Sequence, residues 1–436
     1  MMKFDTFGQV IGFLESYGSL KDIPSQETVR KYRLERIKTL LNVLGNPQNT
    51  YRTIHVAGSK GKGSTASYIA KGIEAAGFRC GLYLSPHVCD YRERFTLAGK
   101  FFDDEVYIKT AEIMAEMLEK TTVTPSVFEM YTAYAFLLFS VAGCDWAVIE
   151  TGLGGRLDAT NIITPQASVL TPIELEHTEI LGDTLEKIAV EKSKIIKPGV
   201  PVFISHQENE AMSVLEKEAE TQHSQVIRLN DCLSELETKQ YEDYQNVSFR
   251  LSGKSFILKL RMTGMVQALN CALALLVLNR FDLICKDTLE TLENNTLPGR
   301  MENLCFRNRS VCLDGAHTLR SMTNLIETFS EIHRKHKGIC IFGSVLGKNY
   351  RKMIQIVLGQ FSKVVIVKPG TFKKSNPQVL YEFAMSVKSP EQTVVLCNNA
   401  TEALTWSIEH STENTPILVC GSFYLAGYIR EAMIQA

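Results

Sequence analysis

A glycine-rich segment with two lysines is the stretch of this chain best suited to chemistry, and it reads Gly58-Ser59-Lys60-Gly61-Lys62-Gly63-Ser64. Closely spaced glycines let backbone N–H groups turn toward phosphate oxygens at the N-terminus of the helix that follows. Lys62 can then reach the outer phosphates, and the hydroxyl of Ser64 can bind a magnesium ion. The spacing departs from the general phosphate-loop pattern, because Gly58 precedes Gly61 by only three positions and Gly63 separates Lys62 from Ser64. A glycine-rich turn is often only a turn, but the apolar strand before it and the helix after it favour nucleotide binding.

Two further polar side chains stand where predicted strands end. Glu150 follows the apolar strand 146–149, and His177 lies beyond the strand 167–170. Alone, such a glutamate is more often a plain strand terminus and a lone histidine is usually structural. Together with the phosphate loop, however, Ser64, Glu150 and His177 are expected at one edge of the sheet, where a phosphate-loop enzyme holds magnesium.

Three other clusters lie where a ligand could reach them. The second glycine-rich loop, 152–161, follows Glu150 and is either a flexible turn or part of the ligand crevice of an open α/β sheet. The apolar helix 266–278 carries Gln267 and Asn270 near its start, where a buried helix would not otherwise want two amides. The sequence Asp314-Gly-Ala-His317 ends another predicted strand.

The elements that must position these groups predict an α/β protein of two domains. Residues 1–297 are expected to form a phosphate-loop ATPase domain with a central, mostly parallel sheet, and residues 298–436 a smaller Rossmann-like, doubly wound domain. Thr296-Leu-Pro-Gly-Arg300 is the candidate boundary, and the two polar edges could face each other across a cleft. The expected helices are 32–44, 64–76, 103–120, 127–142, 184–197 and 266–278; the expected strands are 80–84, 146–149, 167–170, a hairpin of 247–251 with 256–260, and five strands beginning near 311, 339, 363, 393 and 416.

Composition narrows the choice of partners. The 436 residues carry a formal net charge of −1, so no global field favours nucleic acid or an anionic membrane. The eleven cysteines contain no C-x-x-C pair, and reduced thiols in a cytoplasmic protein are expected instead of a zinc site or a disulfide framework. The apolar stretch 131–149 contains Asp145 and predicts a buried helix followed by a buried strand instead of a membrane span. The N-terminus has no secretory pattern.

From about residue 30 onward the chain resembles the folylpolyglutamate synthase/dihydrofolate synthase family, within the wider Mur ligase group. The matching segments occur in the same order along the chain, which is far more specific than one glycine loop. They are His55 to Ser64, Ser85-Pro-His87, Phe128-Glu129, Glu150 to Asn161, His177 to Gly182, Glu191-Lys192, Ile195 to Gly199, Leu297-Pro-Gly-Arg300, Asp314-Gly-Ala-His317 and Gly421-Ser-Phe423.

The resemblance implies an ATP-dependent ligase that forms an amide bond. A folate or dihydropteroate carboxylate would attack the γ-phosphate of ATP, and the amino group of L-glutamate would displace phosphate from the resulting acyl phosphate. Domain closure would exclude water from that intermediate. ATP, two magnesium ions, small-molecule substrates and a monomeric protein are expected.

The resemblance also assigns roles to individual residues. ATP would be bound by the loop residues 58–64 together with Asn270, Arg300 and Asp314. Ser64, Glu150, His177 and Lys192 match the family's metal site, Lys192 as a carbamate, and Lys62, Lys192 and His317 match its catalytic groups. Ser85, Phe128, Leu157, Asp158 and Ala159 match the lining of its pterin-side pocket. Two simpler readings stay open, namely a core role for Phe128 and a solvated helix face carrying Glu191 and Lys192.

Several positions depart from the family pattern. Ser59-Lys60 replaces Thr-Asn, Glu176 replaces Asp, Thr318 replaces Asn, Gly347-Lys348-Asn349 replaces Asp-Lys-Asp, and Lys31-Tyr32-Arg33 replaces Asp-Leu-Gly. ATP use and amide ligation are expected to survive these changes, whereas dihydrofolate synthase activity is put in question.

Three other functions are compatible with parts of this pattern. Another amino-acid ligase of the group, acting on a cell-wall nucleotide precursor, would share the loop and the domain order. A phosphate-loop kinase or GTPase-like switch would leave Asp314 and His317 unexplained. A family member that binds nucleotide or folate without catalysis would account for the acids lost beside Lys348.

Overall fold

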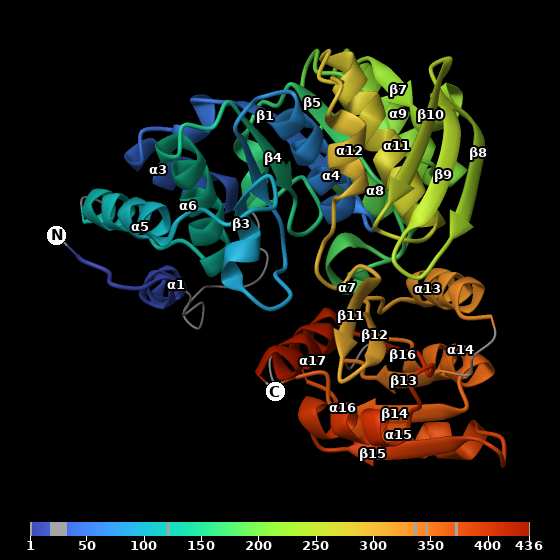
Figure 1. Ribbon diagram of the computed structural model, residues 1–436. Helices are drawn as coiled ribbons and strands as arrows, with labels where there is room; N and C mark the ends of the chain where they lie inside the picture. Colours follow the sequence, from blue (N-terminus) through green and yellow to red (C-terminus); the bar gives the residue numbers. More distant parts are fainter. Residues whose placement is uncertain are drawn as a thin grey trace.

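The computed structural model describes residues 2–17, 33–119, 123–334, 338–345, 348–370 and 374–435. The helices and strands fall into a larger N-terminal part and a smaller C-terminal part, drawn in blue to yellow and in orange to red in Figure 1. Three residues named above lie outside the described residues: Lys31, Gly347 and Tyr32, at which a helix was predicted to begin.

The N-terminal part is built on a seven-stranded sheet in the order β3-β2-β4-β1-β5-β6-β7. Only β3 is antiparallel to its neighbour, and β1, β4 and β5 are buried at nearly every position, as expected of a parallel sheet covered on both faces. Its strands are β1 (Arg52–Ala57), β2 (Cys80–Tyr83), β3 (Phe95–Leu97), β4 (Trp146–Glu150), β5 (Ala167–Leu170), β6 (Val202–Ile204) and β7 (Val226–Arg228). The carboxyl ends of β1, β4 and β5 meet at one edge, because these strands are parallel neighbours.

Helices cover both faces of this sheet. The apolar residues of α4 and α11 pack with Ile54 and Val56 of β1 in one core, and those of α5 and α6 form a second core on the other face. Close packing explains Gly72 in α4, where a Cβ would lie 2.1 Å from the side chain of Leu278 in α11. The helices are α1 (Phe7–Ser16), α3 (Arg33–Val43), α4 (Lys62–Ala75), α5 (Asp104–Leu118), α6 (Val127–Val141), α7 (Thr178–Leu181), α8 (Leu185–Ser193), α9 (Asn209–Thr221), α10 (Leu229–Cys232), α11 (Met265–Arg280) and α12 (Thr288–Glu293), with 3₁₀ turns at Pro47–Asn49, Tyr91–Arg94 and Ala159–Ile162.

A separate antiparallel sheet of β8 (Leu233–Gln240), β9 (Gln245–Leu251) and β10 (Lys254–Leu260) packs beside α11. The predicted hairpin is β9 and β10. Strand β8 was not predicted; its alternation is interrupted by Glu235, which has a left-handed backbone, and by a register shift between Ser234 and Glu237.

The C-terminal part is a six-stranded sheet in the order β11-β12-β16-β13-β14-β15, with helices on both faces, so the doubly wound expectation is confirmed. Five strands begin within three residues of the predicted positions; the edge strand β11, antiparallel to β12, was missed. The elements are β11 (Glu302–Phe306), β12 (Arg309–Leu313), α13 (Leu319–Ile332), β13 (Ile339–Phe342), α14 (Tyr350–Gln360), β14 (Lys363–Val367), α15 (Pro377–Val387), β15 (Thr393–Cys397), α16 (Ala400–Glu409), β16 (Ile417–Cys420) and α17 (Phe423–Gln435).

Two helix boundaries differ from the sequence prediction. α4 begins at Lys62 instead of Ser64, so Lys62 and Gly63 belong to its first turn. α8 ends at Ser193, four residues earlier than expected, because Pro198 disfavours helical backbone before it and Gly199 adopts φ +71°. The stretch 131–149 divides into α6 and β4, and no helix in the described part of the chain is long and apolar enough to cross a membrane.

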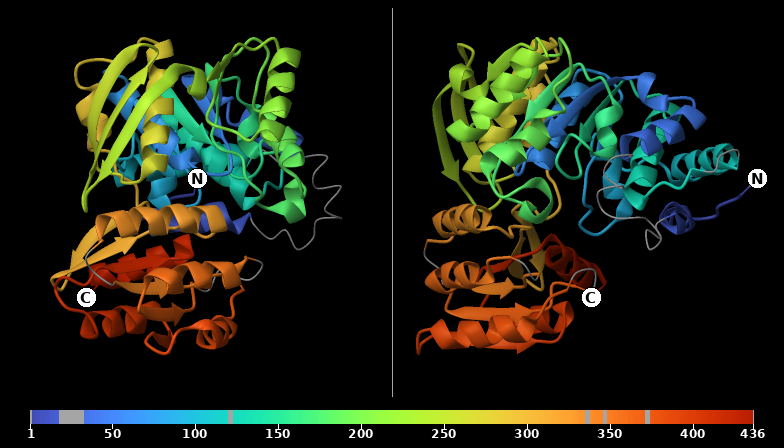
Figure 2. Two further views of the ribbon diagram at one scale, coloured as in Figure 1. Left: turned by 90° about the vertical axis from the view of Figure 1, so that its right-hand side faces the viewer. Right: turned by 180° about the vertical axis from the view of Figure 1, so that it is seen from behind.

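The two parts of the molecule meet in the region of α7 and α13 (Figures 1 and 2). Leu297 packs against the core of α4 and α11, whereas Met301 belongs to a core of the C-terminal sheet. We therefore keep 297/298 as the proposed domain boundary.

Candidate functional site

The phosphate loop joins β1 to α4 at the carboxyl edge of the sheet. Two of its glycines are required by close approach as well as by backbone conformation. At Gly58 (φ +150°) a Cβ would lie 2.8 Å from the carbonyl oxygen of Thr171, and at Gly61 (φ +83°) it would lie 2.6 Å from Oδ1 of Asn270. Asn270 is therefore pressed against the loop, as an ATP-binding role predicts, and it also accepts a hydrogen bond from the Thr65 hydroxyl at 3.3 Å.

Not every backbone amide of the loop is available to a phosphate. The N–H groups of Ser59 and Lys60 donate to the carbonyl oxygen of Pro172, at 2.8 and 3.2 Å. The first N–H groups of α4 have no acceptor within their own helix, since every α-helix leaves its first four amides unpaired. The amides at the start of α4, from Lys62 onward, are therefore the ones that a phosphate could use, and the Ser59–Lys60 half of the loop is held in place by the β5–α7 segment.

Glu150 lies beside the first turn of α4. The position that a Gly63 Cβ would take is 3.4 Å from Oε2 of Glu150, which also accepts the backbone N–H of Ser85 at 3.0 Å. Lys62 Nζ stands 3.9 Å from Oε1. Burial raises the pKa of this carboxyl, and Lys62 and the more distant Arg300 only partly offset it. A buried carboxylate whose lysine partner stands as far away as 3.9 Å is suited to binding a metal cation.

Of the predicted metal ligands, Ser64 and Glu150 supply oxygen donors of the kind magnesium prefers, and His177 supplies a ring nitrogen. Ser64 is buried in the first turn of α4, next to Gly63, and Glu150 faces that turn. His177 has a left-handed backbone (φ 48°) at the start of α7, and its ring is 39% exposed. Burial lowers its pKa, so it is available as a neutral ligand. No cluster of three or more His, Cys, Asp or Glu side chains suited to a metal occurs within the described ranges, but the predicted set contains only two residues of these types.

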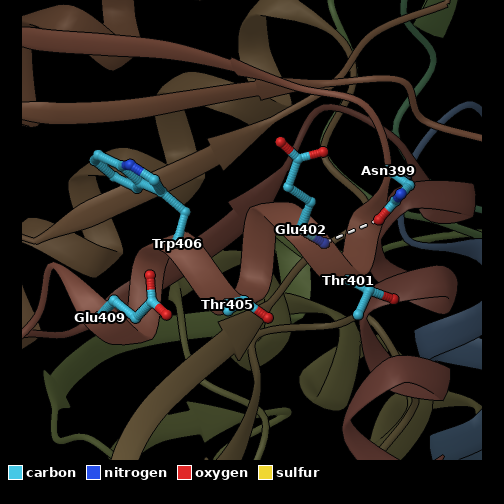
Figure 3. A pocket seen from close by; sticks show the side chains of 6 residues that line it. All are labelled: Asn399, Thr401, Glu402, Thr405, Trp406 and Glu409. Carbon is cyan, nitrogen blue, oxygen red and sulfur yellow. Dashed lines mark hydrogen bonds between the residues drawn. The ribbon is translucent and has the colours of Figure 1, made fainter.

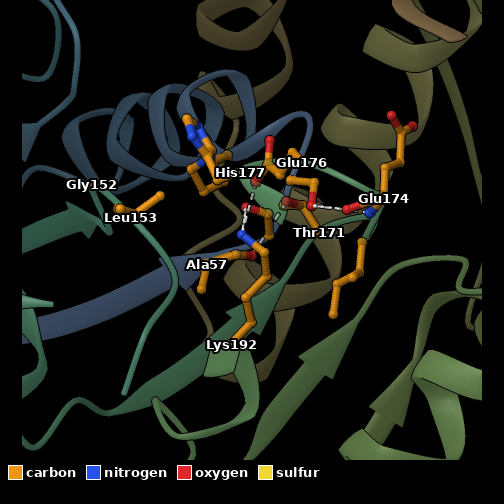
Figure 4. A network of polar contacts seen from close by, with 12 residues as sticks. Ala57, Gly152, Leu153, Thr171, Glu174, Glu176, His177 and Lys192 are labelled. Atoms are coloured by element: carbon orange, nitrogen blue, oxygen red, sulfur yellow. Dashed lines mark hydrogen bonds and ion pairs between the residues drawn. The ribbon is translucent and has the colours of Figure 1, made fainter. Parts of the chain in front are cut away.

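Lys192 is not on a solvated face. It is buried, and its Nζ donates to the carbonyl oxygen of Gly58 at 2.7 Å and to Oε1 of Glu176 at 3.0 Å. Figure 4 shows Lys192 and Glu176 pointing toward each other below His177. Burial lowers the pKa of Lys192 to about 8, against the opposing effect of Glu176. For Glu176, burial is outweighed by Lys192, Lys62 and Lys60, which hold its pKa at about 2.

Glu191, beside Lys192 on α8, has a different environment from its neighbour. Its carboxylate pairs with Arg156 at 2.8 Å, and it therefore serves the second glycine-rich loop. Of Glu191 and Lys192, only Glu191 is compatible with the alternative that these residues lie on a solvated face of the helix.

The pterin-side residues surround that same loop. The ring of Phe128 lies against Gly152, where a Cβ would come within 2.3 Å of it, and it is only partly buried. Asp158 is buried, and its carboxylate accepts the N–H groups of Gly152, Leu153 and Thr160, so it shapes the loop. Leu157 is partly exposed and Ala159 is buried. Phe128 thus packs against this loop and remains partly exposed beside it.

The C-terminal part contributes three predicted residues from the end of β12 and the turn before β11. The carboxylate of Asp314 accepts the N–H groups of Met301 and Ala316, at 2.9 and 2.7 Å. Arg300 stacks its guanidinium on the ring of Phe423, 4.1 Å from the centroid. Burial raises the pKa of Asp314 and lowers that of Arg300, and each charge partly offsets the effect on the other.

His317 is neutral and has a defined tautomer. Its Nδ1 lies 2.8 Å from the carbonyl oxygen of Gly315 and must donate to it, which leaves the lone pair on Nε2. Burial, together with the positive charge of Lys60, lowers its pKa to about 3. Lys60 of the phosphate loop thus acts electrostatically on His317, although the two residues come from different parts of the chain.

Sequence reasoning missed three contributors to this arrangement. Phe423 supports both Arg300 and His317, with the ring centroids of Phe423 and His317 5.9 Å apart. The backbone of Glu174 is hydrogen-bonded to the hydroxyl of Ser59 in the loop. The carbonyl oxygen of Pro172 accepts the N–H groups of Ser59 and Lys60. The signals in the sequence were the family segment Gly421-Ser-Phe423 and the pair of acids, Glu174 and Glu176, just before His177.

A separate shallow pocket lies along α16, far along the chain from these residues (Figure 3). It is lined by Asn399, Thr401, Glu402, Thr405, Trp406 and Glu409, and none of the predicted site residues contributes to it.

Comparison with known proteins gives the same assignment as the site. Residues 56–278 match the Mur ligase middle domain, and residues 299–423 match the Mur ligase glutamate ligase domain. The folylpolyglutamate synthase of Lacticaseibacillus casei is 31% identical over 412 residues, covering 92% of this chain and 94% of that protein. The dihydrofolate synthetase of Saccharomyces cerevisiae is 30% identical over 420 residues, covering 90% and 96%.

Solved structures agree. The folylpolyglutamate synthase of Mycobacterium tuberculosis complexed with ADP superposes with a TM-score of 0.86 at 28% identity, covering 98% of this chain and 97% of that one. The folylpolyglutamate synthase of Thermotoga maritima gives 0.81 at 31% identity, covering 92% and 93%. With the loop, the buried acid and the two-part nucleotide site in place, this chain belongs to the folylpolyglutamate synthase/dihydrofolate synthase family of Mur ligases.

Proposed function

We propose that this protein is an ATP-dependent ligase that joins L-glutamate to the carboxylate of a folate or dihydropteroate through an acyl phosphate. One observation carries the proposal. The turn that carries His317 reaches the segment bonded to the phosphate loop, with Arg320 Nε 3.5 Å from Oε1 of Glu174, and Lys60 of the loop lowers the pKa of His317. Arg300 and Asp314 lie in the same C-terminal part. A kinase or GTPase-like switch has no need of this second set.

The reaction divides into two steps. The substrate carboxylate attacks the γ-phosphorus of ATP and ADP leaves; the amino nitrogen of glutamate then attacks the acyl carbon and phosphate leaves. Lys62 and the first amides of α4 would hold the phosphates, and Asn270, Arg300 and Asp314 would bind the rest of the nucleotide. These groups act by positioning and by neutralising charge on the phosphoryl group in transfer.

His317 would serve the second step. The ammonium group of glutamate must lose a proton before its nitrogen can attack. Because the pKa of His317 is lowered to about 3, its neutral Nε2 would accept a hydrogen bond from the amino group and orient it without taking its proton. The hydrogen bond from Nδ1 to the Gly315 carbonyl leaves Nε2 as the acceptor.

Ser64, Glu150 and His177 would hold magnesium beside the phosphates, where it would neutralise charge on the transferring group. Lys192 carries the proposed carbamate, whose negative charge would help to bind a second ion. The lowered pKa of its amine supports this modification, because only a neutral amine adds to carbon dioxide. We also propose a monomeric, cytoplasmic protein; all eleven cysteines are free thiols in this structure.

The test is to incubate the protein with ATP, magnesium and L-glutamate, offering dihydropteroate and tetrahydrofolate separately, and to identify products by mass. Phosphate release should require both the glutamate and one of the pterin substrates, and Lys62→Ala should abolish it. A product with tetrahydrofolate but none with dihydropteroate would make this a polyglutamylase. If ATP binds but no product forms with either substrate, the protein is a non-catalytic member of the family.

A uridine nucleotide precursor of the cell wall should be included as a third substrate. Glutamate- or amino-acid-dependent phosphate release with that compound alone would favour the other amino-acid ligases of the group.

A further inference from the structure

One arginine of the C-terminal part lies between two carboxylates of the N-terminal part. Arg320, in the first turn of α13, has its Nε 3.5 Å from Oε1 of Glu174 and its Nη1 3.9 Å from Oε1 of Glu208. Glu174 is only 15% exposed, whereas Arg320 and Glu208 are about half exposed. In Figure 1, α13 lies near α7 at the level where the two parts meet.

Glu174 is fixed to the phosphate loop by its own backbone. Its N–H donates to Oγ of Ser59 at 3.0 Å, and the Ser59 hydroxyl donates to its carbonyl oxygen at 3.1 Å. Two residues earlier, Pro172 accepts the N–H groups of Ser59 and Lys60. Four hydrogen bonds therefore make the Ser59–Lys60 half of the loop and the 172–174 segment one unit.

Arg320 is fixed to His317 in the same way. The capping box of α13 joins Thr318 and Ser321, and the Ser321 hydroxyl also accepts the N–H of His317 at 3.2 Å. His317 and Arg320 thus belong to one short, internally hydrogen-bonded unit. Any contact that seats Arg320 also sets the position of the His317 ring.

We propose that Glu174 and Arg320 are positioning residues, an ion pair between the two parts of the molecule that holds His317 over the phosphate loop. The pair joins two internally hydrogen-bonded units, and neither residue needs to touch a substrate. Glu208 provides a second, more exposed carboxylate for the same arginine. The inference rests on the proposed ligase function for its kinetic readout, but not for its structural one.

The pair also bears on Lys60, whose ammonium acts electrostatically on Glu174 as Arg320 does. When Arg320 is seated, Glu174 is shared between two cations, and less of its charge is directed at Lys60. Lys60 is then freer to interact with a bound phosphate. This gives the unusual loop lysine a place in the docked arrangement.

The test is a double-mutant cycle of Glu174→Gln and Arg320→Gln. Each single variant should lower kcat/KM for glutamate by about two- to fivefold, the range expected of an ion pair with one exposed partner. The double variant should be no worse than either single one, and Arg320→Lys should restore part of the loss. Added salt should lower the wild-type value toward that of Arg320→Gln and leave the variant nearly unchanged.

Small-angle X-ray scattering provides a readout independent of catalysis. With the non-hydrolysable analogue AMPPCP and magnesium, wild-type protein should become more compact than Arg320→Gln. Arg250→Gln is the matched control, because Arg250 pairs with Glu235 at 3.7 Å within the outer sheet and should change neither measurement.

Two results would overturn the proposal: additive losses in the double variant, or identical scattering and kcat/KM in Arg320→Gln and wild type. Absence of ligase activity in the wild type would instead count against the proposed function, while the scattering comparison would still test the ion pair.

Discussion

At the scale of single residues, the site is governed by burial of charge. Lys192 and Glu150 are buried, and Glu176, Arg300 and Asp314 are partly buried. Neighbouring charges and hydrogen bonds compensate part of the cost for each of them. Such groups are the ones whose protonation and modification depend on the fold.

Lys192 should take up carbon dioxide in a pH-dependent way. Its pKa is lowered from 10.5 to about 8, so the neutral amine makes up about a tenth of the population at pH 7 and about half at pH 8. Carbamate formation should therefore increase as the pH rises from 7 to 9. With ¹³C-labelled bicarbonate, a carbamate signal in the ¹³C NMR spectrum should appear over this range and grow when magnesium is added.

Lys187, exposed on the same helix, gives the control for this experiment. The signal should persist in Lys187→Ala and disappear in Lys192→Ala, together with ligase activity. A signal of equal intensity in both variants would show that the modified amine is not Lys192.

Phe423 should matter for nucleotide binding through Arg300. Phe423→Leu removes the ring on which the guanidinium stacks at 4.1 Å, and loss of a cation–π contact of about 1 kcal/mol corresponds to a rise in KM for ATP of about fivefold. Phe423→Tyr keeps the ring and should retain most of the affinity. Steady-state kinetics with ATP as the varied substrate measure both.

The matched control for Phe423 is Phe383, which stacks with Arg351 at 5.2 Å on the far side of the same sheet. Phe383→Leu should leave KM for ATP unchanged. An equal rise in both leucine variants would mean that domain stability, and not Arg300, is responsible.

At the scale of elements, the phosphate loop depends both on its backbone conformation and on close contact with neighbouring side chains. Gly61 combines a left-handed backbone with a contact to Asn270, whereas Gly253, in the β9–β10 turn, has nearly the same φ (+81°) and nothing near it. A comparison of substitutions at the two glycines therefore separates the effect of backbone strain from the effect of crowding.

Alanine at either position should cost about 1–2 kcal/mol of stability, because both backbones are left-handed. Only Gly61→Ala should also displace Asn270 and raise KM for ATP, by about tenfold for about 1.4 kcal/mol of lost binding. Thermal unfolding and ATP kinetics on both variants make the comparison. A KM that rises equally in Gly253→Ala would refute the role given to the Asn270 contact.

The sequence was most informative where function is encoded locally. The strand–loop–helix unit at 52–75, the buried α6 and β4, and the five parallel C-terminal strands followed from apolar periodicity and glycine spacing. What it could not supply were contacts between segments far apart in the chain. Pro172 with the loop, Phe423 with Arg300, and Arg320 with Glu174 depend on how finished elements pack, and no local pattern encodes them.

At the scale of the whole molecule, the proposed nucleotide site is divided between the two parts. The loop and Asn270 would come from one part and Arg300 and Asp314 from the other, so a bound nucleotide should link the stability of the two. Saturating ligand at about 100 times its Kd stabilises a folded protein by about 2.7 kcal/mol, and here that stabilisation should reach both parts.

Hydrogen exchange can test this linkage directly. AMPPCP with magnesium should slow exchange at residues 58–64 and at 314–317 together, because the nucleotide contacts both. In Asp314→Ala the Met301 and Ala316 amides lose their acceptor and the nucleotide loses one contact, so protection should remain at 58–64 and fall at 314–317. Strand β14, buried in the far half of the C-terminal sheet, should show no change on nucleotide binding and provides the internal control.

Protection confined to 58–64 in the wild type would mean that the nucleotide is bound by the loop alone, and that the C-terminal residues act only in the later, glutamate-dependent step.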